Sequence, residues 1–215
     1  FVMRVNQSGG IQWAVRVGGE YGDVGRGIAS VGLGGALVTG YFMGMVSFGS
    51  TELTTGDINA DAFVMHVTST GTIDWAVRAG GGSVDGGTGI ASDGAGGALV
   101  TGSFEGTASF GATTLTSAGD RDVFVMRVNS AGGIEWAVRA GGESGDSGNG
   151  IAPDGAGGAL VTGRFEGTAS FGTTTLTSAG SSDVFVMRCV VPPVSPPPSP
   201  PSLPPPSPPP PSVQA

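Results

Sequence analysis

Lysine is absent from this chain, and histidine and cysteine each occur only once. All nine basic residues are arginine, and the net charge of −8 is carried entirely before residue 191. A chain without a basic stripe repels phosphate, so we expect no nucleic-acid partner. One histidine, one cysteine and no lysine leave no nucleophile–base pair, so we expect no enzymatic activity and no catalytic residues. No apolar stretch approaches the roughly 20 residues that a membrane span needs.

Proline is almost missing from the first 190 residues, where only Pro153 occurs, whereas 14 prolines lie between Pro192 and Pro211. We therefore predict a folded domain over 1–190 and a disordered tail over 191–215. Ser-Pro repeats of this kind populate polyproline II, which would make the tail a semi-rigid spacer on the order of 75 Å long. The tail resembles the stalks of plant and algal hydroxyproline-rich cell-wall glycoproteins, which implies secretion and O-glycosylation. An SH3-type ligand is the alternative, and the lack of flanking Arg or Lys disfavours it.

The start of the chain carries no initiator methionine and no signal-like segment, because Phe1 already belongs to a predicted strand. We expect a processed, truncated or excised chain. Glycine is abundant, with 42 residues, but it has no every-third-residue period, so collagen is excluded.

One unit of about sixty residues is repeated along the domain. The pattern Phe-Val-Met begins at residues 1, 63, 124 and 185, with offsets of 62, 61 and 61. Trp13, Trp75 and Trp136 follow the same offsets. Self-similarity at such a period is typical of solenoids, propellers and arrays. We therefore predict three repeats of about 61 residues and a partial fourth that begins near residue 185.

Each repeat contains two predicted hairpins. The first spans 89–104, with an Asp-Gly turn between short apolar strands, and recurs at 27–42 and 150–165. The second spans 123–139, and its first strand is apolar on both faces except for one arginine. A half-exposed strand would alternate, so this pattern predicts a sheet buried on both faces, as in stacked propeller blades.

An insert lengthens each predicted blade. Residues 105–122 separate the two hairpins, and we expect them to form a small extra hairpin at the rim with Phe110 and Leu115 pointing inward. The insert explains why the repeat exceeds a usual blade of about 40–45 residues.

The repeat resembles a known family. The segments Asp-Val-Phe-Val-Met-Arg-Val, Gly-Ile-Glu-Trp-Ala-Val-Arg-Ala-Gly-Gly, Ala-Leu-Val-Thr-Gly and Gly-Thr-Ala-Ser-Phe-Gly are similar, in that order, to the SBBP-type β-propeller repeat of large secreted and cell-surface proteins. The resemblance implies a propeller fold without enzymatic activity. A weaker resemblance links Gly-Gly-Ile-Glu-Trp to the tryptophan-docking turn of quinoprotein propellers, but nothing matches their cofactor ligands, so we expect no cofactor.

The strand count departs from a closed propeller. With four strands A to D in a blade, the chain has the order C-D, A-B-C-D, A-B-C-D, A-B-C, whereas closed propellers have about four to eight blades. The segment 11–17 could supply the missing D strand if the ring closed. We expect an open or partial propeller that is either a fragment of a longer array or self-associates through its open blade edges.

The repeated aromatic and acidic residues each have two interpretations. Trp13, Trp75 and Trp136 would stack on sugars or dock one blade on the next, and their periodicity inside an apolar strand favours docking. Calcium is the ligand to consider for the loop residues Asp23, Asp85 and Asp146. Each loop offers one or two carboxylates, whereas calcium takes six to eight oxygens, so hydrogen bonds to backbone amides of the turn are favoured.

The remaining polar candidates are also assigned structural roles. We predict that Asp61, Asp122 and Asp183 cap turns, and that Arg16, Arg78 and Arg139 form ion pairs with the loop aspartates rather than capture an anion. His66 replaces an arginine and is predicted to face solvent without making a metal site. Cys189 stands where other repeats have valine and is predicted to be a core residue, with a reactive or intermolecular thiol as the alternative. Asn6 begins an Asn-Gln-Ser glycosylation sequon in a turn.

Two functions remain open on this evidence. The first is a non-enzymatic extracellular, cell-wall or cell-surface module, in which the repeats form a scaffold for a protein or glycan and the tail gives reach. The second is a non-catalytic propeller domain of a larger secreted hydrolase or lyase. The full-length gene would separate them, since a neighbouring catalytic domain supports the second.

Overall fold

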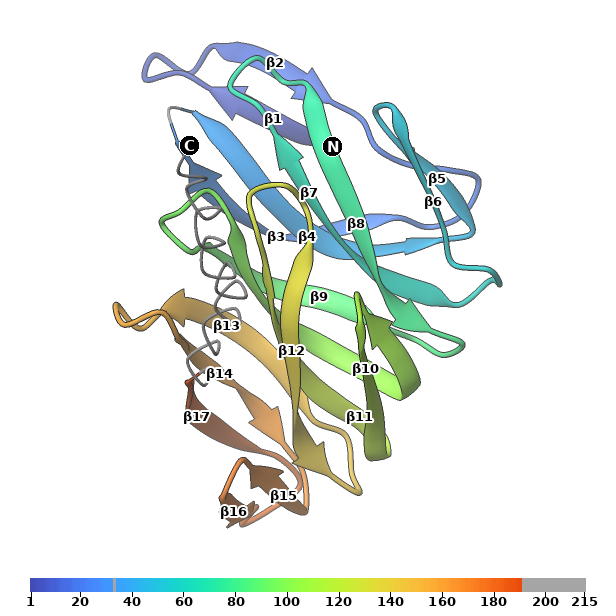
Figure 1. The fold of residues 1–215 in the computed structure, drawn as a ribbon, viewed down its shortest axis with the longest axis vertical. Coiled ribbons are helices and arrows are strands. Elements are labelled where there is room, and N and C mark those ends of the chain that lie inside the picture. The colour runs from blue at the N-terminus through green and yellow to red at the C-terminus, as the bar shows by residue number, and fades with distance from the viewer. Residues whose placement is uncertain (33, 191–215) are drawn as a thin grey trace, which may run out of the picture.

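The computed structural model describes residues 1–32 and 34–190, and the predicted polyproline tail over 191–215 lies outside them. The described chain is all-β, as the sequence predicts: seventeen strands pair antiparallel, and none of their sheets closes on itself. Figure 1 shows the repeats following one another along the long axis, from the N-terminal hairpin at one end to the last repeat at the other. In the described residues there is no helix with the length and apolar character that a membrane crossing needs.

Three groups of strands repeat one antiparallel order, and we call them units 1, 2 and 3. Unit 1 contains β3 (Val24–Val31), β4 (Gly35–Met43), β7 (Ala60–Val67) and β8 (Ile73–Gly81). Unit 2 contains β9 (Gly86–Ser92), β10 (Ala98–Phe110), β11 (Thr113–Val128) and β12 (Ile134–Gly142). Unit 3 has three strands among the described residues: β13 (Ser147–Pro153), β14 (Ala159–Phe165) and β17 (Asp183–Cys189). A separate N-terminal hairpin of β1 (Val2–Val5) and β2 (Ile11–Val15) precedes unit 1.

The predicted insert is a rim hairpin in every unit. It consists of β5 (Met45–Phe48) with β6 (Thr51–Thr54) in unit 1, and of β15 (Thr168–Phe171) with β16 (Thr174–Thr177) in unit 3. In unit 2 it is an unbroken extension of β10 and β11 rather than a separate hairpin. Backbone pairing also crosses between units: β8 pairs with the extension of β10, and β12 pairs with β15. These bonds join most of units 1 and 2 and the rim of unit 3 into one ten-stranded sheet.

The core lies between the faces of neighbouring units. The middle strand β7 and residues 122–128 of β11 are buried at successive positions, because each has a unit or hairpin on both faces. Each unit repeats a cluster of three phenylalanines in which the rim ring lies edge-on to one neighbour. In unit 2, Phe110 lies 5.6 Å from Phe104 and 5.0 Å from Phe124, and it is 1% exposed, as predicted. Leu115 packs against the same core and is partly buried.

The first strands of the units, β3, β9 and β13, lie against one another. Glycine makes this close approach possible at two positions. A Cβ on Gly27 would lie 2.9 Å from Thr88 O, and a Cβ on Gly89 would lie 2.8 Å from Asn149 O. The equivalent position in unit 3, Gly150, contacts only Thr162 of its own unit. One side of the β13 backbone is therefore open to a further strand.

Candidate functional site

An aspartate–arginine–aspartate cluster lies where unit 1 meets unit 2. Asp61 on β7 accepts a hydrogen bond from Nε of Arg78 on β8. Asp85, in the loop before β9, accepts hydrogen bonds from Gly81 N at 2.7 Å and from Glu105 N at 3.1 Å. Asp61 and Asp85 are 0% and 1% exposed. The cluster therefore ties three strands and a loop together through two buried carboxyl groups and a partly exposed arginine.

The same cluster recurs where unit 2 meets unit 3. Arg139 Nη1 donates to Asp122 Oδ2 at 2.5 Å, and Asp146 accepts from Gly142 N at 2.8 Å and Glu166 N at 3.1 Å. The loop aspartates thus bind backbone amides, which is the arrangement expected of turn-stabilising carboxylates. The predicted ion pairs with the loop aspartates are wrong: Arg78 and Arg139 pair instead with the aspartate of the neighbouring strand, and Arg16 forms no ion pair among the described residues. The arginine and the strand aspartate lie on adjacent strands, which places their side chains in contact, whereas the loop aspartate follows the end of the arginine's strand.

Each cluster contains two aspartates but only one arginine. Asp61 Oδ1 and Asp122 Oδ1 are buried without a hydrogen-bond partner among the described residues. Burial, with a smaller contribution from the nearby Asp61 carboxylate, raises the pKa of Asp85 to about 7 against the opposing effect of its two backbone hydrogen bonds. Burial also raises the pKa of Asp61 to about 6, against the opposing effect of Arg78. A proton shared between the two carboxyls would remove the excess charge of the cluster.

The third loop aspartate, Asp23, lacks this environment. It accepts hydrogen bonds from Gly19 N at 2.8 Å and Met43 N at 3.2 Å, as its counterparts do, but no strand aspartate faces it in the described residues.

Asp183 is a strand aspartate that faces no loop aspartate and no arginine in the described residues. It accepts a hydrogen bond from Ala179 N at 2.7 Å, which is the turn-capping bond predicted for it. Asp122 makes the same bond with Ala118 N at 2.9 Å. The three calcium candidates, Asp23, Asp85 and Asp146, therefore all accept hydrogen bonds from backbone amides.

The repeated tryptophans lie at the boundaries between units. Trp13 Nε1 donates to Ser69 O at 3.0 Å, and Trp75 Nε1 donates to Ser130 O at 3.0 Å. In both cases the acceptor belongs to the turn of the following unit, and the indole ring packs on a turn glycine, Gly71 or Gly132. These contacts are those of docking between units, not of a sugar platform. Trp136 instead lines a groove beside unit 3.

His66 differs from the prediction that it faces solvent. Its side chain is 22% exposed, lies 3.3 Å from Asp74 and has its ring 5.9 Å from that of Trp75. In unit 2 the equivalent Arg127 forms an ion pair with Asp93 at 2.8 Å. The position of Asp93 is Val31 in unit 1, so His66 meets only Asp74, the equivalent of Glu135, which lies 3.4 Å from Arg127 in unit 2.

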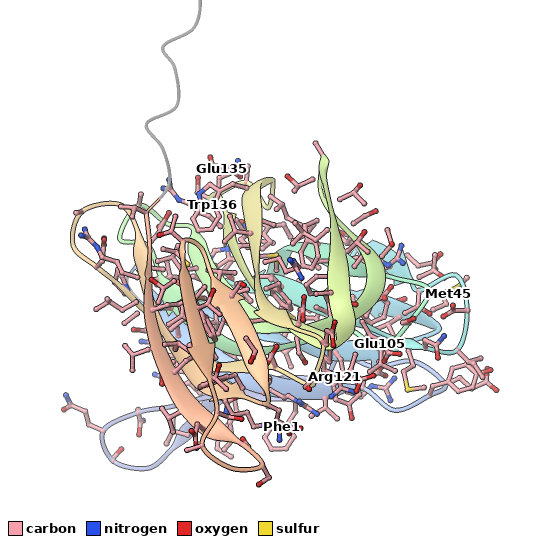
Figure 2. The ribbon with its side chains drawn as sticks, turned by 90° about the horizontal axis from the view of Figure 1, so that it is seen from below. Phe1, Met45, Glu105, Arg121, Glu135 and Trp136 are labelled. Carbon is pink, nitrogen blue, oxygen red and sulfur yellow. The ribbon has the colours of Figure 1, made fainter. Side chains whose placement is uncertain are left out.

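The groove beside unit 3 has a volume of about 480 Å³ and lies where units 1 and 2 have their fourth strand. Its lining combines apolar and cationic side chains: Trp136, Phe171, Met187, Arg139 and Arg188. Cys189 also lines it and is half-buried, and burial raises the pKa of its thiol. Figure 2 shows Trp136 and Glu135 together at one edge of the ribbon.

A second, polar hollow of about 290 Å³ lies between units 2 and 3. Charged residues from both units line it: Glu105, Asp120, Arg121, Asp146 and Arg164. Glu105 and Arg121 are paired across β10 and β11 and lie side by side in Figure 2. Burial raises the pKa of Asp146 at its base, and the Asp122 and Glu166 carboxylates raise it further. Such an array of carboxylates and guanidinium groups can hydrogen-bond a polyhydroxylated ligand from several sides.

This hollow was missed by sequence reasoning, which followed only the repeated residues. By strand register the matching positions between units 1 and 2 are uncharged, namely Met43, Asn59, Ala60 and Ser103. The charges are thus specific to one boundary. A comparison of where the repeats differ, rather than where they agree, would have found them.

The predicted glycosylation residue Asn6 lies in the turn between β1 and β2 and is exposed. Its Oδ1 accepts hydrogen bonds from Ser8 N at 3.1 Å and Gly10 N at 2.8 Å.

Comparison with known proteins gives this chain no family: no family model matches it, and no curated protein matches it.

Proposed function

We propose that the protein is a non-enzymatic extracellular or cell-surface scaffold, built as an open β-propeller, that binds a glycan in the polar hollow between units 2 and 3. The stacked four-stranded units and their periodic tryptophans support the propeller. The proline-rich segment, with its resemblance to cell-wall stalks, supports the location.

The proposal rests on the difference between the charged residues that recur at both unit boundaries and those that occur at only one. The repeated carboxylates at the unit boundaries are buried and bonded to arginine or backbone amides, so they serve the fold. Glu105, Asp120, Arg121 and Arg164 have no charged counterparts at the boundary between units 1 and 2, and together they line a hollow just below the 300–1,000 Å³ of ordinary ligand sites. Mixed carboxylate and guanidinium groups suit the hydroxyl groups of a neutral sugar, which both accept and donate hydrogen bonds.

The experiment is calorimetric titration of the full chain with neutral hexasaccharides of glucose, xylose, mannose and galactose. We expect one of them to bind with a dissociation constant between about 1 mM and 1 μM, and Arg164→Ala to weaken binding at least about tenfold. Asn59→Ala, at the equivalent boundary that lacks the charges, is the matched control and should bind as the unchanged protein does.

Chromatography of the titrated sugars shows whether they are turned over. We expect intact oligosaccharides after prolonged incubation. Cleavage that Asp146→Asn abolishes would contradict the non-enzymatic proposal, and absence of binding to all four sugars would contradict the glycan site.

A further inference from the structure

Unit 3 presents a set of uncovered surfaces whose counterparts are covered in the other units. Strand β17 pairs with β14 along one edge and has no partner strand on its other edge among the described residues. In units 1 and 2 the equivalent strands β7 and β11 pair at that edge with the fourth strands β8 and β12. Val184 and Val186 are 75% and 74% exposed, although the equivalent Val123 and Val125 are both 0% exposed. An apolar strand with a free edge recruits another strand.

The N-terminal hairpin presents uncovered surfaces that are complementary to those of unit 3. Strand β2 and the residue after it repeat the sequence of the fourth strands, Ile-x-Trp-Ala-Val-Arg, but β2 pairs only with the four residues of β1. Ile11 is 66% exposed, whereas the equivalent Ile73 is 8% exposed. Arg16 is exposed and forms no ion pair within the described residues, unlike Arg78 and Arg139.

From these complementary ends we propose that two copies of the chain associate reciprocally, the β17 strand of each pairing with the β2 strand of the other in place of β1. The inference rests on the propeller architecture of the proposed function and identifies a partner of the scaffold. The seven residues of β17 offer a longer ladder than the four of β1. A two-stranded hairpin is marginally stable by itself, which favours the exchange.

The register of the exchanged strands follows from the internal repeats. In unit 2, Val125 pairs with Val138 and Val128 pairs with Ile134. The same register places Val186 opposite Val15 and Cys189 opposite Ile11 of the second copy. It is also the register that β1 now uses, in which Val2 pairs with Val15 and Val5 with Ile11.

This register completes three half-formed sites at once. Asp183 meets Arg16 and Asp23, which rebuilds the aspartate–arginine–aspartate cluster of the internal boundaries. Ile11 reaches the rim turn at Gly172, where an added Cβ would have no neighbour within 4 Å, whereas a Cβ on Gly49 or Gly111 would lie 3.2 or 3.1 Å from Ile73 or Ile134.

The third site is on the first strands. Ile28, 62% exposed, meets the open side of Gly150 in the way that Ile90 lies beside Gly27, where an added Cβ would be 3.1 Å from Ile90 Cγ2.

Two copies are the number that closes the assembly. Each contributes three units, and the exchanged β2 strand supplies the missing fourth strand of unit 3. The pair then contains six four-stranded units, within the range of about four to eight found in closed propellers. A head-to-tail interface that closes gives a discrete ring, whereas one that does not close gives an open filament.

The first test uses the single cysteine. Directly opposed residues of antiparallel strands have Cα atoms about 4.5–5.5 Å apart, within reach of a disulfide. In the full chain, Ile11→Cys is expected to give a disulfide-linked dimer with Cys189 on mild oxidation. Ile58→Cys, at a rim position that is 67% exposed, is the matched control and should stay monomeric in denaturing gels. Equal crosslinking of both variants would overturn the proposed register.

The second test uses the charges. Light scattering of the full chain should give twice its mass of 21.0 kDa. Arg16→Asp and Asp183→Arg should each raise the dimer dissociation constant at least about thirtyfold, because each leaves a buried charge unpaired. Mixing the two variants should restore the dimer, since each junction of the mixed pair then contains opposite charges. A monomer, an open polymer, or a mixture that stays monomeric would overturn the proposal.

These outcomes are separable from those of the proposed function. A monomer that binds the sugar would remove the reciprocal dimer and leave the glycan scaffold standing. A dimer that binds none of the sugars would remove the glycan site and leave the reciprocal dimer standing. Far-UV circular dichroism of every variant shows whether the β structure is retained, so a folding failure is not counted as a loss of association.

Discussion

The indole Nε1 of Trp75 donates a 3.0 Å hydrogen bond to the backbone oxygen of Ser130, which belongs to the next unit. The ring also covers Gly132 of the same turn, where a Cβ would lie 3.0 Å from the indole. One side chain therefore fixes the distance between two units by both a polar and an apolar contact. Trp13 makes the same two contacts with unit 1.

Trp75→Phe should lower the free energy of unfolding by about 1–2 kcal/mol, because it removes this hydrogen bond and part of the packed ring. Urea denaturation of the full chain measures the change. Met45→Leu, at an exposed rim position, is the control and should change the free energy by less than about 0.5 kcal/mol. Equal effects of the two substitutions would show that the indole does not hold the units together.

Asp85→Asn should make stability less dependent on pH. The pKa of Asp85 is raised by burial from 3.8 to about 7, so its protonated form stabilises the fold fully below about pH 4. That contribution is lost as the pH rises through about 7. The unchanged protein should therefore lose about 1–3 kcal/mol of unfolding free energy between about pH 4 and pH 8, and the variant clearly less.

The comparison for this prediction is Asp23→Asn. Asp23 makes the same backbone bonds as Asp85, but no strand aspartate faces it in the described residues. Urea denaturation across the pH range should show an unaltered slope for Asp23→Asn. A slope that Asp85→Asn also leaves unaltered would mean that the two carboxyls do not share a proton.

Asp93→Asn should show the opposite dependence on pH. Burial favours a higher pKa, but Arg127 and the amides of Ala95 and Gly97 outweigh it and hold the pKa of Asp93 below 3.8. The ionised group thus stabilises the fold above about pH 4, and its contribution is lost as the pH falls through the lowered pKa. The substitution should cost less than about 1 kcal/mol at pH 7 and nothing at about pH 2, by thermal denaturation. A cost that grows toward acid pH would refute the ion pair.

Gly141→Ala should destabilise the protein by about 1–3 kcal/mol, since Gly141 has a φ of 149° and lies against two carboxyls. A Cβ there would collide with Asp122 Oδ1 and lie 2.7 Å from Asp146 Oδ2. Gly82→Ala is the matched control, because its Cβ would have no neighbour within 4 Å. Urea midpoints of the two variants that coincide would contradict this tight packing of the cluster.

The all-β class and most strands could be predicted because the repeat presents the same local signals several times. The Asp-Gly turns and the doubly apolar Phe-Val-Met strand each recur, so chance patterns are averaged out. The strand ends were harder to predict. In unit 2, β10 continues to Phe110 and β11 begins at Thr113, so one ladder runs into the hairpin that pairs with β8 of the preceding unit. Pairing between units leaves no signal in a local window.

The polar hollow could not be predicted by the same means. Glu105 and Arg164 are 59 positions apart and belong to different units, and only the stacking of those units brings them to one cavity. The ion pair of Arg139 was likewise assigned to the wrong aspartate, because spacing along the chain does not reveal which carboxylate the strand register places opposite it.

The strand pairing across unit boundaries bears on how the chain responds to force. Gly81 and Gly80 pair with Ala108 and Ser109, and Gly142 and Gly141 pair with Ala169 and Ser170. Separating two units therefore requires breaking backbone hydrogen bonds in addition to exposing apolar faces. Under tension we therefore expect neighbouring units to yield together rather than one at a time.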